Sequence, residues 1–146
     1  MERRIESLNR RILTVDYGSA RIGIAMSDPL RIFAKPFKVL ENRGFKALLQ
    51  ELKQLVAIHE AGLVILGMPY AIDGGNTAKT IEIHNLYAKL KHKLGVPVIT
   101  WDERYSTSDA IAELKMMGLS LEESKKLRDA MAACLILKSY LDGTNQ

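Results

Sequence analysis

The feature that most constrains the fold is a short, uninterrupted apolar segment at residues 63–67, LVILG. An apolar run of this length is typical of a strand that is buried on both faces of a parallel sheet. The residues that follow, MPYAIDGGNTAKT, are rich in turn formers, so the strand is expected to end there. A buried parallel strand of this kind indicates an α/β protein.

Four further strands are predicted around this segment. Residues 12–16 (ILTVD) and 21–27 (RIGIAMS) are separated by a short turn that begins at Gly18, which predicts a hairpin. A third strand is expected within residues 32–40, near an edge of the sheet, because Pro36 has no amide hydrogen to donate. The last predicted strand is VPVITW, residues 96–101.

Helical periodicity fills the intervals between these strands. Apolar residues recur at three-and-four spacing from Phe45 to His59, which predicts an amphipathic helix that ends at Ala61-Gly62. Further helices are predicted at residues 77–94, 106–118 and 121–141. This order of elements predicts an α/β sandwich with a mixed sheet.

The length of 146 residues is that of one ordinary domain, so we expect a single domain over residues 1–146. Residues 1–10 are expected to be an N-terminal extension and residues 142–146 a C-terminal tail. No apolar run approaches the roughly 20 residues that cross a bilayer, and the first residues lack the apolar core of a secretion signal. We therefore expect a cytoplasmic protein without a membrane partner.

Cysteine and histidine offer little chemistry. Cys134 lies within AMAACLIL, where the expected role is that of a small buried hydrophobe. The three histidines are His59, His84 and His92. They lie in predicted helices, and their spacing does not suggest a zinc site. The formal net charge of +4 and the pI near 9.2 are compatible with an anionic partner such as nucleic acid.

Acidic residues mark the ends of the predicted elements. Asp16 ends the first strand, Asp102 and Glu103 follow the last strand, and Asp129 precedes eight consecutive apolar residues. A carboxylate at such a position is costly unless it is paired, hydrogen-bonded or bound to a cation. Asp129 alone is also explained by the attraction of an acid to a helix N-terminus. As a set, converging carboxylates favour Mg²⁺ or Mn²⁺, and two such ions catalyse phosphodiester cleavage in known enzymes.

Four segments together resemble one family. They are LTVDYGSARIGIAMSD, VILGMPYAIDGG, WDERYSTSDA and RDAMAACLILKSYL, and they span residues 12–141. In this order they resemble the YqgF family of RuvX-like proteins, described as Holliday junction resolvases and as nucleases that trim the ends of pre-16S ribosomal RNA. The resemblance implies a ribonuclease H-like fold, a central mixed five-stranded sheet flanked by helices.

The resemblance also implies roles for the acids. Asp16 would be the first metal ligand, shared between ions, with Glu103 the second and Asp129 the third. Neighbouring residues of a strand point to opposite faces, so Asp102 and Glu103 are not both expected in the site unless the strand has ended. We favour Glu103 and keep Asp102 as a catalytic candidate. Gly23 is expected to leave room above the metal.

Substrate contacts are expected from residues near these acids. Arg21 and Arg104 would meet a phosphate or form an ion pair with a nearby acid. Thr107 would cap the helix that follows it or touch substrate, and Asn76 would reach the nucleic-acid backbone from the loop at residues 69–77 or lie in an ordinary turn. A cluster of basic residues just before Asp129 would neutralise phosphates, and it comprises Lys125, Lys126 and Arg128.

These expectations combine into one leading function and its alternatives. The leading function is metal-dependent cleavage of structured nucleic acid, with the 5′ end of pre-16S ribosomal RNA as substrate on the basis of the resemblance alone. The alternatives are a Holliday junction resolvase acting on branched DNA, and a non-catalytic nucleic-acid-binding factor in ribosome assembly or transcription. A resolvase would be a symmetric dimer, because two strands must be cut, so both a monomer and a homodimer stay open.

Overall fold

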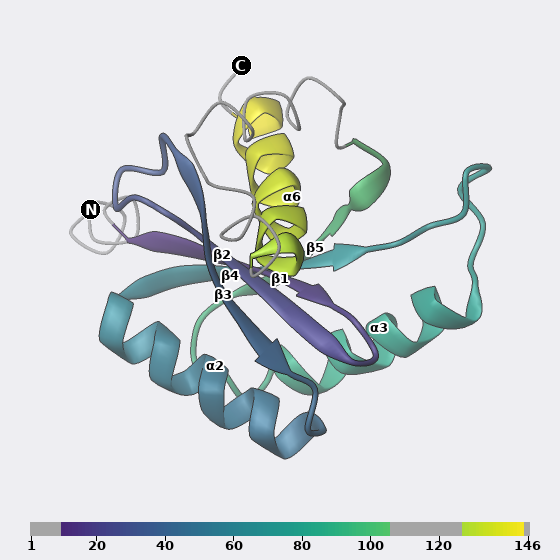
Figure 1. Cartoon of the computed structure of the whole chain (residues 1–146), viewed down its shortest axis with the longest axis horizontal. Coiled ribbons are helices and arrows are strands. Elements are labelled where there is room, and N and C mark those ends of the chain that lie inside the picture. The colour runs from purple at the N-terminus through teal and green to yellow at the C-terminus, as the bar shows by residue number, and fades with distance from the viewer. Residues whose placement is uncertain (1–9, 106–126, 145–146) are drawn as a thin grey trace.

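The computed structural model describes residues 10–105 and 127–144. Its core is a five-stranded sheet in the order β3-β2-β1-β4-β5 (Figure 1). β1 pairs with β4 and β4 with β5 in parallel, whereas β2 pairs with β1 and β3 in antiparallel fashion. The strands are β1 (Arg11–Tyr17), β2 (Arg21–Ser27), β3 (Ala34–Glu41), β4 (Ala61–Met68) and β5 (Val98–Asp102). The predicted mixed five-stranded sheet is confirmed.

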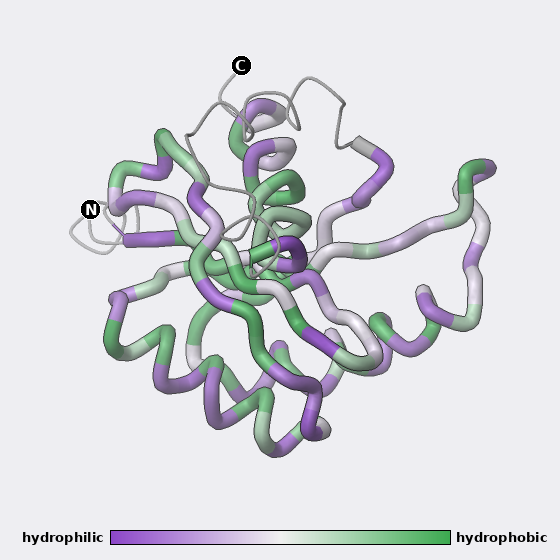
Figure 2. Tube along the Cα trace, in the orientation of Figure 1, coloured by the Kyte–Doolittle hydropathy of each residue, from purple (hydrophilic) through white to green (hydrophobic). Residues whose placement is uncertain are grey.

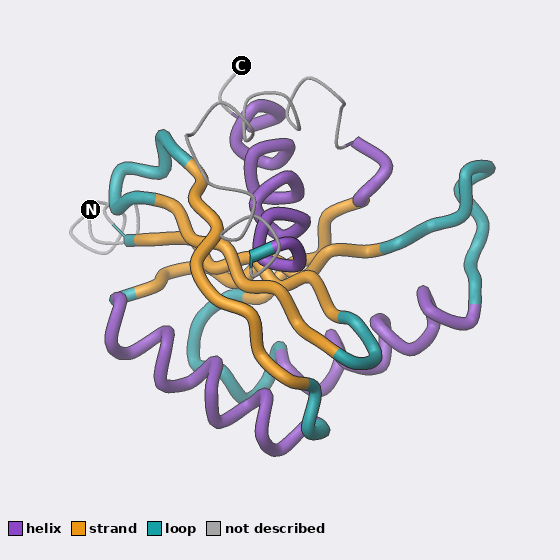
Figure 3. Tube along the Cα trace, viewed as in Figure 1, coloured by secondary structure: helices purple, strands orange, loops and turns teal. Residues whose placement is uncertain are grey.

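Helices cover both faces of this sheet. α2 (Phe45–His59) and α3 (Ala78–Leu90) pack on one face, and α6 (Arg128–Thr144) crosses the other, as Figures 1 and 3 show. Buried side chains form one apolar cluster under each layer, so β1 contributes Leu13 to the first cluster and Ile12 to the second. This two-sided burial is the reason that β4 carries almost no polar residue.

The predicted elements of the described chain are present in the structure, and the differences concern where some of them end. Glu60 adopts a left-handed conformation (φ 53°) that ends α2, so Ala61 and Gly62 belong to β4 rather than to a helix terminus. α3 stops at Leu90, although the periodic pattern continues to Leu94, which is buried in a turn. α6 continues to Thr144, so most of the expected C-terminal tail is helical. The predicted helix at residues 106–118 and the start of the one at 121–141 lie outside the described residues.

Two expectations about individual residues are confirmed. Pro36 lies in the edge strand β3, and the register between β2 and β3 shifts between Ile24 and Ala25, next to the Ala25–Pro36 pair. Cys134 is fully buried, and this burial raises the pKa of its thiol to about 12. Within residues 10–105 and 127–144, no helix has the length and apolar character needed to cross a membrane.

Thr14 is the basis of a stability prediction. Its side chain is fully buried on β1, and its hydroxyl finds no hydrogen-bond partner among the described residues. A buried hydroxyl without a partner costs about 1 kcal/mol or more. Thr14→Val keeps the shape and removes this cost, so the free energy of unfolding in urea should rise by about 1 kcal/mol. A fall in stability would show that the hydroxyl is hydrogen-bonded in solution.

Candidate active site

Asp16 and Glu103 meet at one end of the sheet. Asp16 is the penultimate residue of β1, and Glu103 is the first residue of a 3₁₀ turn, η1 (Glu103–Tyr105), that follows β5. Both strands run parallel to β4, so their carboxyl ends lie at the same edge. The side chains of Asp16 and Glu103 lie close enough that each carboxyl group shifts the pKa of the other.

Burial and mutual repulsion shift the protonation of this pair. The pKa of Glu103 rises to about 7, first because the group is desolvated and then because of the charge and hydrogen bond of Asp16. The pKa of Asp16 is also raised, mainly by burial and further by the charge of Asp129, while the hydrogen bond from Glu103 and the charge of Lys79 oppose the rise. Glu103 therefore titrates near neutral pH, and a pKa perturbed in this way is typical of functional carboxylates.

The pKa of Glu103 is directly measurable. In ¹³C-detected NMR titrations without metal, the Glu103 carboxyl resonance should shift with a midpoint near pH 7. In Asp16→Asn the charge that repels Glu103 is removed, so the midpoint should fall toward the ordinary value of 4.5. A midpoint near 4.5 in the wild-type protein would contradict the described contact.

Asp129 approaches the pair from the other layer. It lies in the first turn of α6, and its Oδ2 accepts a 2.8 Å hydrogen bond from Nε of Arg21, at the start of β2. This is the ion-pair alternative expected for Arg21. The negative charge of Asp129 still acts on Asp16, so the third acid of the predicted set faces the same region.

Gly23 explains how the helix comes so close. It lies opposite Asp16 in the β1–β2 register. A Cβ atom at Gly23 would overlap the backbone carbonyl group of Asp129 and lie 2.9 Å from the amide nitrogen of Ala130. The space over Gly23 is therefore filled by the first turn of α6. The expectation that Gly23 leaves open room above a metal is wrong in this respect, because the missing side chain admits a helix.

Asp102 and Glu103 diverge because the strand ends between them. Asp102 is the last residue of β5, and its carboxylate is held by Arg104, with Nη2 2.6 Å from Oδ2 and the backbone amide 2.9 Å from Oδ1. This contact holds the pKa of Asp102 below its ordinary value. Arg104, like Arg21, therefore forms the ion pair that was one of its two expected roles. Glu103 lies beyond the strand and turns to Asp16 instead, which agrees with the preference for Glu103 over Asp102.

Two residues that the sequence did not single out support the pair. A Cβ atom at Gly67, near the end of β4, would lie 2.7 Å from Oε1 of Glu103 and 2.6 Å from Cδ1 of Ile136. Lys79 lies in the first turn of α3, 5.0 Å above the ring of Tyr17, and its charge lowers the pKa of both acids. No local sequence pattern around Lys79 indicates that it lies near Asp16 and Glu103.

The loop at residues 69–77 projects from the body of the protein beside this edge (Figure 3). Nη1 of Arg104 donates to the carbonyl oxygen of Ile72 (3.2 Å), and its guanidinium lies 5.7 Å from the ring centre of Tyr70. Arg104 therefore ties the loop to Asp102. Asn76 is exposed in this loop.

The predicted basic residues are only partly described. Arg128 is exposed at the start of α6, next to Asp129. Thr107, Lys125 and Lys126 lie outside the described residues. The structure thus brings Arg21 and Arg128 to the region of Asp129 and places Arg104 and Asn76 on the adjoining loop side.

The donor set suits a hard cation, although the side chains are not arranged around one. Within the described ranges, no three Asp, Glu, His or Cys side chains are positioned to hold a metal ion together. Asp16 and Glu103 are in direct contact, and Asp129 is turned to Arg21. Carboxylate oxygens without nitrogen or sulfur are the ligands that Mg²⁺ and Mn²⁺ prefer.

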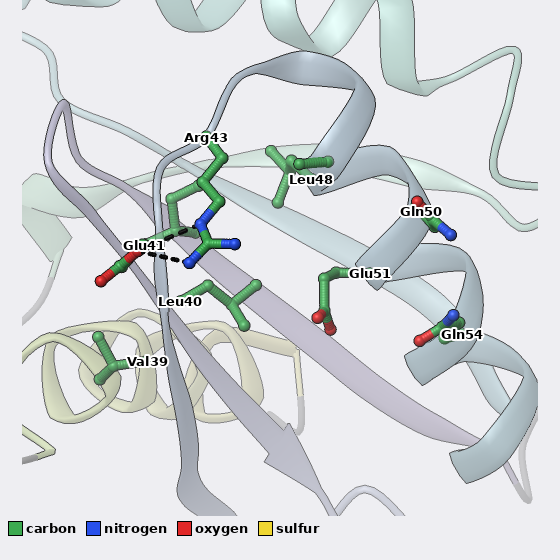
Figure 4. Close-up of a pocket in the computed structure, with 10 residues that line it drawn as sticks. Val39, Leu40, Glu41, Arg43, Leu48, Gln50, Glu51 and Gln54 are labelled. Carbon is green, nitrogen blue, oxygen red and sulfur yellow. Dashed lines mark hydrogen bonds and ion pairs between the residues drawn. The ribbon is translucent and has the colours of Figure 1, made fainter.

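A groove of about 460 Å³ lies away from these acids, between β3 and the first half of α2 (Figure 4). Glu41 and Arg43 line the groove and form a 2.9 Å ion pair, and both side chains are about three-quarters exposed. Gln50 and Gln54 line the groove from α2 (Figure 4). The groove is not lined by Asp16, Asp102, Glu103 or Asp129, so the groove and the carboxylate pair are separate features.

Comparisons with known proteins agree on the family. Residues 10–143 match the family described as "RuvX: Holliday junction resolvase". A protein named "Putative pre-16S rRNA nuclease" from Maridesulfovibrio salexigens is 37% identical over 131 residues, covering 90% of this chain and 97% of that protein. Another with the same name from Syntrophomonas wolfei is 37% identical, covering 91% and 94%.

A solved structure agrees on the fold. Thermus thermophilus RuvC in complex with a Holliday junction substrate superimposes with a TM-score of 0.61 at 16% identity, covering 92% of this chain and 97% of that one. The ribonuclease H-like fold that the sequence resemblance implied is confirmed.

Proposed function

This chain belongs to the RuvX family, and from that membership we propose that it is a metal-dependent nuclease that hydrolyses phosphodiester bonds in structured nucleic acid. The observation that carries the proposal is the close approach of Asp16 and Glu103 at the carboxyl end of the sheet, with the charge of Asp129 acting on Asp16. Two partly buried carboxyl groups so close together are costly without a cation, because each disfavours the ionisation of the other.

Asp16, Glu103 and Asp129 would hold the metal. When bound, Mg²⁺ or Mn²⁺ would stabilise the negative charge that develops on the oxygens around phosphorus. The protein's own part is to ionise Glu103, whose pKa is raised to about 7, and to release Asp129 from Arg21. Arg21 lies 63% exposed, so it would then be available to a substrate phosphate.

We propose that basic residues around the acids hold the nucleic-acid backbone. Arg128 is exposed beside Asp129, and Lys79 stands next to Tyr17 on the opposite side of β1. Arg104 and Asn76 would contact the backbone from the loop side. Thr107, Lys125 and Lys126 are proposed contacts on the sequence pattern alone.

The names of the relatives favour pre-16S ribosomal RNA as the substrate. Cleavage near its 5′ end is proposed from the sequence resemblance alone. The second candidate is a resolvase of four-way DNA junctions, which the family description and the fold of RuvC favour. A junction resolvase would act as a homodimer, whereas trimming of one RNA end needs only a monomer. A cytoplasmic location suits either substrate and is part of the proposal.

The test uses purified protein, a precursor 16S RNA fragment with its 5′ extension, and a four-way DNA junction of matched length. With Mg²⁺ or Mn²⁺ the RNA should be cut near the mature 5′ end, and with EDTA it should stay intact. Cleavage of the junction alone would assign the resolvase function. Tight binding of either substrate without cleavage, with either metal, would contradict the nuclease and favour the non-catalytic binding factor.

Gly67→Ala should weaken cleavage with little loss of stability. The three atoms nearest to the added methyl group belong to the side chains of Glu103 and Ile136, which can move aside. Movement of Glu103 breaks its contact with Asp16, so we expect a fall in kcat of about tenfold or more, as for misplaced catalytic groups generally. Melting temperature and steady-state cleavage rates measure the two effects. Wild-type cleavage by Gly67→Ala would show that the position of Glu103 does not matter.

A further inference from the structure

An apolar face lies at the end of the sheet opposite the carboxylate pair. It comprises the loop from β2 to β3, the start of β3 and the last turn of α2. The large side chains exposed on it are Leu30 (63%), Ile32 (55%), Phe33 (65%), Phe37 (38%) and Ile58 (71%). Figure 2 shows hydrophobic colour on the projecting loop between β2 and β3. Most of the large exposed apolar side chains of the described chain therefore gather in one region.

His59 joins these side chains into one surface. Its ring packs edge-on against Phe37 at 5.0 Å. A groove of about 350 Å³ is lined by Phe33, Phe37 and His59, and a second hollow beside it is lined by Pro29, Ile58 and again His59. The apolar face is thus continuous across both hollows and is not a set of isolated exposed residues. Contiguous apolar surface of this kind marks interaction sites.

The loop presents its apolar side chains in a fixed conformation. Oδ1 of Asp28 accepts hydrogen bonds from the amides of Ile32 (2.8 Å) and Phe33 (2.6 Å). The amide of Arg31 donates to the carbonyl oxygen of Asp28 (3.0 Å). These bonds hold Ile32 and Phe33 toward solvent. A loop that is ordered in this way loses little further entropy when a partner binds.

Cations surround the face more than anions do. Arg11 lines both hollows and Lys35 lines the larger one. Arg31 belongs to the loop between β2 and β3 that carries the exposed apolar side chains. Two acids lie near the face in the part of the chain that the structure describes. The carboxylate of Asp28 accepts hydrogen bonds from the loop amides, and Glu60 lines the smaller hollow. The rim is therefore positively charged and complements an acidic partner.

We propose that this face binds an apolar segment of a protein partner that carries acidic side chains. Aliphatic side chains such as Ile32 and Ile58 offer little to stacked bases, which disfavours nucleic acid. Two copies of this chain would bring like charges together across the face, which disfavours a homodimer there. β1 spans seven residues, so the face lies about 20 Å from Asp16. A partner held there leaves the acids open, and the proposal stands independently of the proposed nuclease function.

The probe is a random 12-residue peptide library displayed on phage and selected against the full-length protein. Enriched peptides should combine aromatic or aliphatic residues with Asp or Glu. By fluorescence anisotropy, their affinity should fall at least about tenfold for Phe33→Ser and Ile58→Ser, as expected for central apolar contacts. Lys35→Glu should weaken binding, and the loss should shrink at high salt. Ile72→Ser, which removes a 98% exposed isoleucine from another loop, is the matched control and should bind normally.

Several results would overturn the proposal. These are enriched peptides without acidic residues, peptides that bind Phe33→Ser as well as the wild type, and wild-type affinity in Lys35→Glu. Self-association in sedimentation that Phe33→Ser abolishes would assign the face to a second copy. Binding of single-stranded RNA that Phe33→Ser abolishes would assign it to nucleic acid.

The melting temperatures of the variants are the folding control. They should equal that of the wild type, which would show that each loss of affinity arises at the surface.

Discussion

Asp16→Asn is expected to abolish metal-dependent cleavage while the folded chain becomes more stable at alkaline pH. The substitution removes one of two carboxylates in direct contact and with it the proposed shared metal ligand. Because a metal site supplies several kcal/mol of transition-state stabilisation, the cleavage rate should fall by about 10³-fold or more. Single-turnover cleavage with saturating Mn²⁺ measures this loss.

The gain in stability follows from the raised pKa values. The pKa of Glu103 is about 7 in the folded chain, above its ordinary value of 4.5. Between these values the folded state binds more protons than the unfolded state, so the free energy of unfolding falls as pH rises from about 4.5 to about 7. The full loss is present above that window. In Asp16→Asn the repulsion is gone, so this pH dependence should shrink and the melting temperature at pH 8 should rise.

Asp142→Asn is the matched control for Asp16→Asn. Asp142 is an exposed acid near the end of α6, 3.6 Å from Lys138. Its replacement should leave both cleavage and the pH dependence of stability unchanged, because surface ion pairs contribute little. Cleavage by Asp16→Asn at the wild-type rate would exclude Asp16 from the reaction.

Gly23→Ala should damage both stability and cleavage. The new Cβ atom meets the backbone of Asp129 and Ala130, which cannot move aside as a side chain can. Either β2 or the first turn of α6 must shift, and overpacking of this kind costs about 1–3 kcal/mol. The shift separates Asp129 from Asp16, so cleavage should fall more steeply than the loss of folded protein explains. Urea unfolding and cleavage at a temperature where the variant is folded measure the two effects.

Gly143→Ala tests whether the effect is specific to the start of α6. Its added Cβ atom would lie 3.3 Å from the ring of Trp101, at the other end of the same helix, so this side chain need shift by only a few tenths of an ångström. We expect only a small change in stability, of about 1 kcal/mol or less, and wild-type cleavage. Equal damage from both substitutions would show that α6 as a whole, rather than its contact with Gly23, controls the site.

Much of the fold follows from local patterns along the chain. The boundaries of α2 agree with three-and-four spacing, because this helix buries one clear face. The boundaries of β2 also agree with the prediction, although every residue of the strand after Arg21 is buried. The end of α3 was predicted too late, because Leu94 is buried from a turn and so continues a helical pattern without being helical. The pairing of Asp16 with Glu103 was accessible from the rule that parallel strands end at one edge.

The remaining contacts of the site depend on tertiary distances that no local pattern contains. Gly23 was read as open space, whereas the structure fills it with α6. Lys79 lies near the acids only because the long loop returns α3 to the sheet edge. Arg21 and Arg104 had two open interpretations, and the structure shows the ion pair for each.

Crystals soaked in Mn²⁺ and measured at the manganese absorption edge test the metal proposal most directly. The anomalous difference map should show a peak within coordination distance of the carboxylates of Asp16 and Glu103, with Asp129 turned from Arg21 toward it. The same soak of Asp16→Asn should lack the peak. A map without manganese at these carboxylates, under conditions in which the protein cleaves nucleic acid with Mn²⁺, would contradict the account.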